Sequence, residues 1–226
     1  MLIIKFILLC SIVFVSTLHA GETWKITSLE WPPYAGSKVE NQGQSIQKLR
    51  KLLQKKDITL IVEFYPWKRS KYLVETNNEY IGIFPAWPED VFDGAIISPA
   101  VDWSEIAILK IADKVVSFNS IDELFEKYSV GIVSTYHYPK IIDNAIKKYP
   151  HNVERASNEL LLLKKLLAGR GDVAITDPIV MRYLSSKIET VSIIMEKELV
   201  LAFRDDEENR QRLKLLTKLL KENEVF

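Results

Sequence analysis

Aromatic residues and prolines gather after three short apolar segments in the first half of the 226-residue chain. Prolines remove backbone donors and fix φ, so each cluster should lie where the chain leaves a sheet. Rings on such stiff loops suit stacking against a flat or apolar part of a ligand. They could equally cover the top of the core, since aromatic burial is common whatever the function. The clusters are Trp31-Pro32-Pro33-Tyr34, Pro66-Trp67-Lys68-Arg69 and Pro85-Ala86-Trp87-Pro88.

The second cluster brings two cations to an expected helix start. Lys68 and Arg69 would lie in the first turn of a helix that follows Pro66. The arginine guanidinium is a planar fork suited to carboxylates, and a helix N-terminus attracts anions independently. The alternative is a solvated helix start whose surface ion pairs contribute about 0–1 kcal/mol. Because Trp67 lies beside these cations, we favour the ligand role slightly.

Polar groups also follow two strands that we expect in the second half of the chain. Ser134, Thr135 and Tyr136 come at the end of one strand. Their hydroxyls and the free amides of the next helix could hold a carboxylate, or could simply cap that helix. Asp177 ends the other strand. Its carboxylate could pair with a ligand ammonium or cap a helix, a role worth about 1 kcal/mol. The spacing leaves both alternatives open at each place.

Catalytic and metal-binding patterns do not stand out in the sequence. His137 and His151 have no cysteine or carboxylate at metal-ligand spacing, so we expect no metal. We find no phosphate-binding loop and no nucleophile elbow, and we expect neither a cofactor nor catalytic residues. An enzyme would need Glu30, Asp177 or His137 as general acid or base, and no spacing singles out such a pair. These groups therefore favour binding over catalysis.

Alternating apolar and amphipathic segments must position these groups. Strands are expected at 24–29, 58–64, 80–84, 106–111, 130–133, 173–175 and 199–203, with helical spacing of leucines between several of them. Such alternation is typical of the α/β class with parallel sheets. In that class ligands bind outside the carboxyl ends of the strands, so we expect the aromatic rings to share one crevice.

The first twenty residues have the pattern of a targeting segment. Lys5 precedes an apolar run over residues 6–15, and a short polar stretch ends at the small Ala20. This predicts a secretory signal peptide over residues 1–20, because the run is too short to span a bilayer. The single cysteine, Cys10, would leave with it, so no disulfide is expected.

The charge balance and the distribution of tryptophans limit the partners and the organisation of the chain after residue 20. The whole chain has 30 basic and 30 acidic residues, and without Lys5 the balance is 29 to 30; with no basic block, this argues against nucleic acid as a partner. All five tryptophans lie between Trp24 and Trp103. This shift indicates two lobes that divide near residues 105–115. The last strand and helix could return to the first lobe, which the pattern alone does not establish.

The order of these segments resembles that of the family 3 periplasmic solute-binding proteins of bacterial transport systems, which capture polar amino acids and related solutes. The resemblance covers nearly the whole chain after residue 20, and it rests on order and spacing together. Its carriers are Glu30-Trp31-Pro32-Pro33-Tyr34, Gly43-Gln44, Pro66-Trp67-Lys68-Arg69, Phe84-Pro85-Ala86-Trp87, Ile97-Ser98-Pro99, residues 120–124, Val130-Gly131-Ile132-Val133 and residues 166–177.

The resemblance implies a two-lobe α/β fold, the periplasmic-binding-protein-like fold of type II, whose lobes are joined by two hinge strands and close on a ligand. It implies a first lobe of residues 21–111 plus 198–226 and a second lobe of residues 112–197. By position, the ligand-lining residues would be Trp31, Tyr34, Trp87 and Ser98 in the first lobe and Ser134, Thr135, Tyr136 and Asp177 in the second. Asp177 stands where such proteins hold the amino group of the solute.

The chain departs from the family pattern between Trp87 and Ser98. Amino-acid binders usually carry an arginine there, which grips the α-carboxylate. Residues 88–97 of this chain contain three acids and no arginine. Arg69 could substitute for it, or the ligand could be cationic or uncharged.

Together these features predict a periplasmic protein that captures a small polar solute, an amino acid or a related compound, for ABC-type uptake. The expected partners are that small-molecule solute and an inner-membrane ABC permease. We expect a monomer that is not an enzyme. Two alternatives stay open: an enzyme on the same scaffold, such as a cyclic-acid dehydratase, and a periplasmic sensor module.

Overall fold

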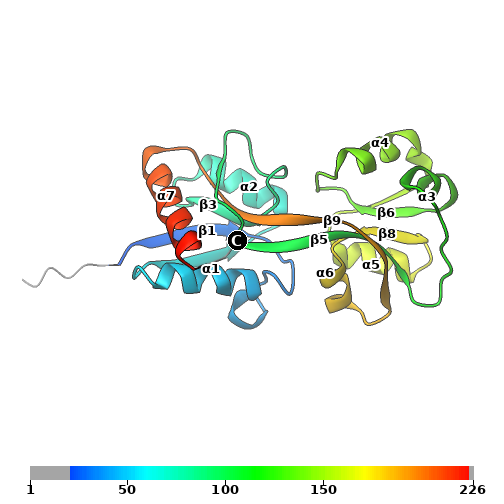
Figure 1. Cartoon of the computed structure of the whole chain (residues 1–226), viewed down its shortest axis with the longest axis horizontal. Coiled ribbons are helices and arrows are strands. Elements are labelled where there is room, and N and C mark those ends of the chain that lie inside the picture. The colour runs from blue at the N-terminus through cyan, green and yellow to red at the C-terminus, as the bar shows by residue number, and fades with distance from the viewer. Residues whose placement is uncertain (1–20, 224–226) are drawn as a thin grey trace, which may run out of the picture.

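A computed structural model describes residues 21–223 of the chain. The predicted signal peptide, residues 1–20, lies outside the described residues. Two long antiparallel strands, β5 (Asp102–Ile111) and β9 (Ile188–Phe203), connect the two halves of the molecule (Figure 1). Among the described strands the sheet order is β2-β1-β3-β9-β5-β8-β6-β7, so β9 and β5 lie at its centre. This confirms the two-lobe α/β fold with two hinge strands that the sequence predicted.

The first lobe is built on the β2-β1-β3 side of the sheet. Strand β1 pairs in parallel with β2 and β3, because the connecting helices return the chain to the same edge. Strands β3 and β4 pair antiparallel with the last residues of β9. The elements are β1 (Thr23–Ser28), η1 (Glu40–Gln42), α1 (Gln44–Gln54), β2 (Thr59–Phe64), α2 (Trp67–Thr76), β3 (Gly82–Ala86), β4 (Ile96–Ile97) and α7 (Glu207–Glu222).

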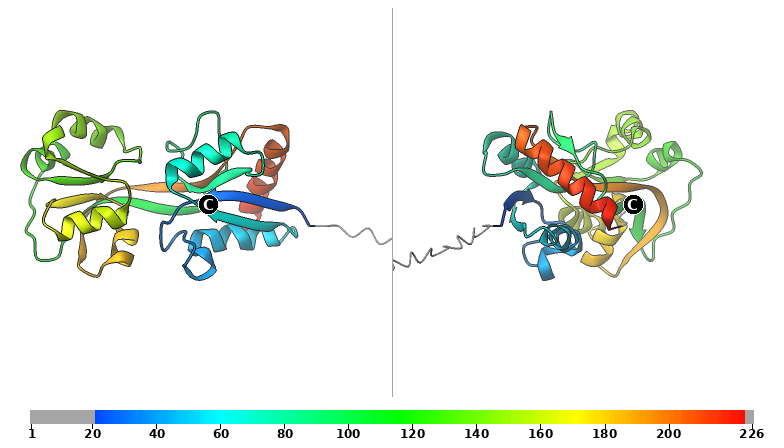
Figure 2. Two further views of the ribbon diagram at one scale, coloured as in Figure 1. Left: turned by 180° about the vertical axis from the view of Figure 1, so that it is seen from behind. Right: turned by 60° about the vertical axis from the view of Figure 1, so that its left-hand side comes forward.

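The second lobe is built on the β8-β6-β7 side. Strand β6 pairs in parallel with β7 and β8, and β8 pairs antiparallel with β5. In each lobe, helices cover both faces of the sheet (Figure 2). The elements are α3 (Ile121–Lys127), β6 (Val130–Val133), α4 (Lys140–Lys148), η2 (Pro150–Asn152), β7 (Val153–Ala156), α5 (Glu159–Leu167), β8 (Val173–Thr176) and α6 (Pro178–Leu184).

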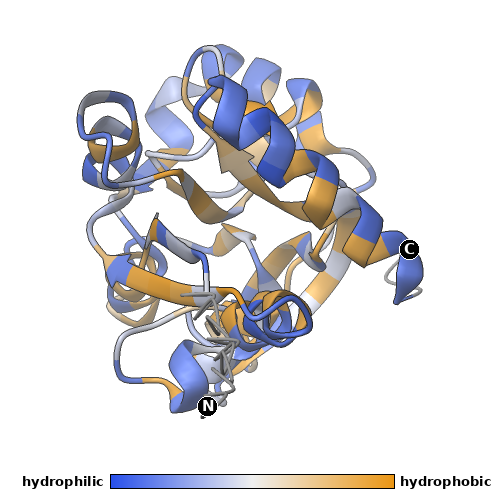
Figure 3. Ribbon diagram, turned by 90° about the vertical axis from the view of Figure 1, so that its left-hand side faces the viewer, coloured by the Kyte–Doolittle hydropathy of each residue, from blue (hydrophilic) through white to orange (hydrophobic). Residues whose placement is uncertain are grey.

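Helix α7 brings the end of the chain back to the first lobe, where it lies near α1 (Figure 1). Arg212 of α7 pairs with Glu22 at 2.7 Å, and Leu216, Leu219 and Leu220 are buried. The leucines recur at helical spacing, so one side of the helix is apolar. Figure 3 shows this division, with hydrophobic and hydrophilic colours on opposite sides of the helices.

The hinge differs from the sequence prediction in two ways. The apolar segment 199–203 is only the end of β9, which begins at Ile188, and β5 begins at Asp102 rather than Ile106. In both strands most of the missed residues are exposed or half-buried, because a two-stranded ribbon between lobes meets solvent on its faces. The sheet is also mixed rather than parallel, since β5 and β9 run antiparallel to each other.

None of the helices within residues 21–223 has the length and apolar character needed to cross a membrane.

Candidate ligand-binding site between the lobes

Four aromatic rings meet where the two lobes face each other. The ring centroids of Trp31 and Tyr34 lie 4.7 Å apart, and Trp31 meets Trp87 edge-on at 6.0 Å. Tyr136, from the loop after β6, meets Trp87 edge-on at 5.1 Å. Edge-to-face packing of this kind adds about 0.5–1.5 kcal/mol per pair beyond area burial. The rings that follow two strands of the first half, β1 and β3, therefore lie together with a ring that follows β6 in the second half.

The Trp31–Tyr34 loop is held in place by its own backbone. The amides of Trp31 and Ala35 donate to each other's carbonyl oxygens at 2.8 and 3.0 Å. Gly43, at φ 105°, passes so close that a Cβ there would lie 2.4 Å from the carbonyl oxygen of Tyr34. Only glycine fits such a position without strain. The loop therefore projects both rings toward the second lobe.

Asp177 is buried at the first turn of α6. Its Oδ1 accepts hydrogen bonds from the amides of Ile179 at 2.7 Å and Val180 at 2.8 Å, which is the helix-capping role. Its Oδ2 accepts from the Tyr34 hydroxyl at 3.1 Å and from the Glu105 amide at 3.2 Å. Burial raises the pKa of Asp177 to about 6, and these donors act against the rise. Burial and the nearby Asp177 charge also raise the pKa of Tyr34.

Glu159 is a second buried carboxylate between the lobes, and the sequence reasoning missed it. Its Oε1 accepts from Trp31 Nε1 at 2.9 Å and from the Thr176 hydroxyl at 3.2 Å, and its Oε2 accepts from the Tyr136 hydroxyl at 3.3 Å. Burial raises its pKa. In sequence it reads as an ordinary first residue of a helix capped by Asn158, so no local signal marks its burial.

Asp90 forms a third contact between the lobes. This carboxylate is 2% exposed and accepts from Trp67 Nε1 at 3.0 Å and Lys71 Nζ at 2.8 Å. Nδ1 of His137, from the second lobe, lies 2.9 Å from Oδ1 of Asp90. The indole of Trp67 thus has a structural partner in its own lobe. His137, isolated in the sequence, meets a carboxylate only through the fold.

Two hollows lie along this crevice. The inner one holds about 20 Å³ and is lined by Leu29, Trp31, Trp67, Pro85, Ala86, Trp87, Asp90 and Tyr136. A volume of this size takes no more than a water molecule. The outer one holds about 610 Å³ and is lined by Leu29, Glu30, Phe64, Tyr65, Pro66, Trp67, Lys68, Ser134, Thr135, Tyr136, Ser157, Asn158 and Glu159. In this conformation the rings themselves fill the inner space, and the outer hollow offers room for a small molecule.

The predicted residues divide into those that line the hollows and those that do not. Trp31, Trp67, Trp87, Ser134, Thr135 and Tyr136 line one or both. Tyr34 and Asp177 are not among the lining residues, and their hydrogen bond joins the lobes. Ser98 is buried and accepts from the Leu201 amide at 3.0 Å, which ties it to β9. Arg69 is exposed, with its guanidinium 5.3 Å from the centroid of the Tyr65 ring.

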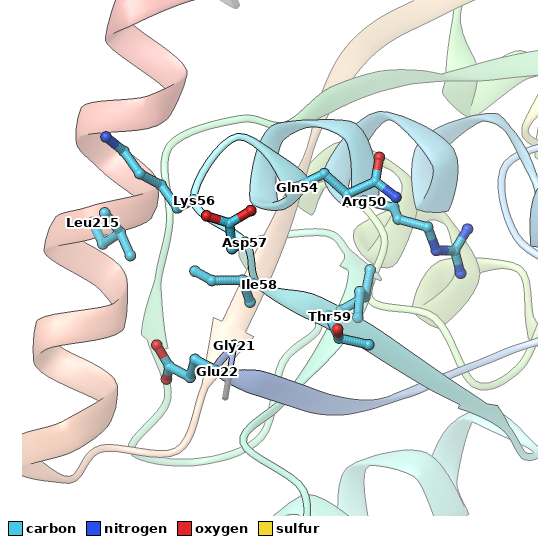
Figure 4. A pocket seen from close by; sticks show the side chains of 10 residues that line it. Gly21, Glu22, Arg50, Gln54, Lys56, Asp57, Ile58, Thr59 and Leu215 are labelled. Carbon is cyan, nitrogen blue, oxygen red and sulfur yellow. The ribbon is translucent and has the colours of Figure 1, made fainter. Parts of the chain in front are cut away.

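A larger hollow of about 940 Å³ lies elsewhere, on the outer edge of the first lobe (Figure 4). Figure 4 places Glu22, Asp57 and Leu215 around it, between the start of β1, the end of α1 and helix α7. It contains none of the aromatic residues of the crevice. Within residues 21–223 no group of three histidines, cysteines or carboxylates is placed to hold a metal ion.

No protein-family model and no curated protein matches the chain in sequence. Solved structures do match it in fold. A histidine kinase sensor domain with similarity to periplasmic binding proteins is 15% identical, with a TM-score of 0.72, over 89% of this chain and 90% of that one. An ancestral arginine-binding protein bound to arginine is 17% identical, with a TM-score of 0.72, over 90% and 93%. The substrate-binding protein of an amino acid ABC transporter is 15% identical, with a TM-score of 0.65, over 88% and 92%.

These identities are low, so the likeness concerns the fold. The chain has the two-lobe fold of periplasmic binding proteins, and at that level the predicted resemblance is confirmed.

Proposed function

We propose that this protein captures a small polar solute, an amino acid or a related compound, between its two lobes. The main support is the crevice between the lobes, beside a hollow of about 610 Å³. There Trp31 and Trp87 of one lobe face Tyr136 and Glu159 of the other. Binding pockets are typically concave, largely apolar and supplied with a few convergent polar groups. The fold shared with arginine-binding and ABC substrate-binding proteins supports this function.

Capture would work through an equilibrium between open and closed lobes. Tyr34–Asp177, Trp31–Glu159 and Asp90–His137 already join the lobes directly. A solute shifts such an equilibrium only by its differential affinity for the closed form. We expect this movement to take place about the two hinge strands, β5 and β9.

A thermal-shift screen over amino acids, amines, organic acids and sugars tests this function. A solute that binds only the folded protein raises the melting temperature by mass action. At one hundred times its Kd, it adds about 2.7 kcal/mol to the free energy of unfolding. Tyr136→Ala should remove the shift, because it takes the second lobe's ring from the crevice. Tyr183→Ala, an exposed tyrosine on α6, is the matched control. No shift with any solute at millimolar concentration would rule out solute capture.

The finer features of the proposal concern location and partners. We infer that residues 1–20 are a signal peptide, that the protein acts in the periplasm as a monomer, and that it delivers its solute to an ABC permease. We place the first lobe at residues 21–111 plus 198–226 and the second at 112–197. Mass spectrometry of the protein from a periplasmic extract should give a chain that begins at Gly21, and light scattering should give the mass of one copy.

A sensor role is the second candidate, because one structural neighbour is a histidine kinase sensor domain. The crevice would serve both roles equally well, so the partner decides between them. Cross-linking in cells should recover a permease if the protein transports and a membrane kinase if it senses.

We propose no enzymatic activity. Another neighbour of the same fold is an ancestral amino acid-binding protein that is a precursor of a cyclohexadienyl dehydratase. Turnover of a cyclic carboxylic acid by the purified protein, lost in Asp177→Asn with binding retained, would support the enzyme instead.

A further inference from the structure

The inference that follows rests on the proposed capture of a solute between the lobes. We infer that Glu159 anchors the ligand through a cationic nitrogen, and that the ligand is an organic amine without a carboxylate group. Glu159 is 3% exposed and lines the outer hollow of about 610 Å³. A buried carboxylate is costly unless it is paired, so a cation is the partner that this group lacks.

Within residues 21–223, the side chains that donate hydrogen bonds to the Glu159 carboxylate are all neutral. They are the Trp31 indole, the Thr176 hydroxyl and the Tyr136 hydroxyl. The shortest is the indole contact at 2.9 Å on Oε1, whereas Oε2 has only the 3.3 Å contact with Tyr136. An ammonium in the hollow would supply a charge-assisted hydrogen bond to Oε2, which is about twice as strong as a neutral one.

The other two buried carboxylates of the crevice are already occupied. Asp90 has Lys71 as an ion-pair partner at 2.8 Å. Asp177 has four hydrogen-bond donors, two on each oxygen, and it does not line either hollow. Glu159 is therefore the buried acid that is open to a ligand in this conformation.

The remaining lining residues suit an organic cation. Four aromatic residues line the hollow, Phe64, Tyr65, Trp67 and Tyr136, and the face of an aromatic ring attracts a cation. The charged side chains of the lining are Glu30, Glu159 and Lys68. Lys68 is exposed, so water and salt screen its repulsion of a bound cation more than they screen the buried Glu159.

The same hollow offers little to a carboxylate. No arginine lines it, and Arg69 nearby is exposed and packs on the Tyr65 ring instead. A ligand carboxylate beside Glu159 would be repelled, because like charges close together disfavour the ionised forms. The hollow should therefore bind an amine more tightly than the α-amino acid that differs from it only by an added carboxylate.

Calorimetry on the wild-type protein tests this with two matched ligand pairs. Agmatine is arginine without its carboxylate, and pentane-1,5-diamine is lysine without its carboxylate. We expect each amine to bind at least tenfold more tightly than its amino acid at neutral pH. The inference is overturned if the amino acids bind as tightly as the amines, or if neither amine binds at millimolar concentration.

Glu159→Gln locates the effect at the anchor. The glutamine keeps an acceptor for Trp31 and removes the charge, so agmatine should bind at least tenfold more weakly while circular dichroism stays unchanged. Glu126→Gln, an exposed glutamate on α3, is the matched control and should change the Kd less than twofold. Unchanged agmatine affinity in a folded Glu159→Gln would overturn the anchor role.

The comparison of ligand pairs uses the wild-type protein, so it stands even if the variant does not fold. If arginine or a neutral solute binds better than the amines, the capture function survives and this inference fails. If nothing in the wider screen binds, both fail.

Discussion

The hydroxyl of Tyr34 lies 3.1 Å from Oδ2 of Asp177, although 143 residues separate the two in sequence. Both side chains are fully buried, and they belong to opposite lobes. The contact therefore couples the packing of the first lobe to the first turn of α6 in the second. Removing this hydrogen bond is therefore a direct test of what the contact between the lobes adds to stability.

Tyr34→Phe should lower the free energy of unfolding by about 1.5–3 kcal/mol, because it removes one hydrogen bond to a buried carboxylate. Urea denaturation at pH 7 measures this. Tyr72→Phe, whose ring is exposed, should change stability by less than about 0.5 kcal/mol. Equal losses in the two variants would mean that the Tyr34 hydroxyl contributes nothing specific.

The raised pKa of Asp177 makes a signed prediction about pH. Its folded pKa is about 6, above the ordinary value of 3.8, so the folded state binds more protons than the unfolded state between these values. This group's contribution to stability must then fall as pH rises from about 4 to 6, by at most about 1.4 kcal/mol per pH unit. Urea denaturation across pH 4–7 should show the fall as a difference between wild type and Asp177→Asn. A difference that stays constant or grows with pH would contradict the burial of this charge.

Gly43→Ala should be far more destabilising than Gly94→Ala, although both glycines have positive φ. A Cβ at Gly43 would meet the Tyr34 carbonyl oxygen at 2.4 Å, whereas nothing lies within 4 Å of one at Gly94. We expect losses of about 2–4 kcal/mol and about 1 kcal/mol, since the first variant adds a clash to backbone strain. Similar midpoints of urea unfolding would show that the Tyr34 loop yields easily.

His137→Ala should shift the molecule modestly toward an open form. The imidazole meets Asp90 across the lobes but is 63% exposed, so the contact contributes about 0–1 kcal/mol, or up to about a fivefold change in the open-to-closed ratio. Single-molecule energy transfer between one dye on each lobe measures that ratio. His151→Ala, an exposed histidine in η2, serves as the control. If the closed population is unchanged in His137→Ala, the contact between His137 and Asp90 does not stabilise the closed form.

The secondary structure of each lobe could be predicted from the sequence because its strands are apolar and its helices have leucines on one side. The hinge part of β9 could not, since residues 188–198 are mostly exposed or half-buried and interrupt their apolar residues with charged and polar ones. The rings of the crevice were found because proline marks the strand ends at Trp31 and Trp87. Glu159 was missed because its burial depends on Trp31, 128 residues away, and no local pattern records that contact.

The two-stranded β5–β9 ribbon has a consequence for how the molecule melts. Each lobe completes its part of the sheet with strands that the other lobe also uses, and β9 alone pairs with β3, β4 and β5. Unravelling one lobe would therefore leave the other with unsatisfied backbone groups along a central strand, a loss that buried peptide groups do not tolerate. Despite its two-part shape, the protein should unfold in one cooperative transition, with calorimetric and van't Hoff enthalpies that agree.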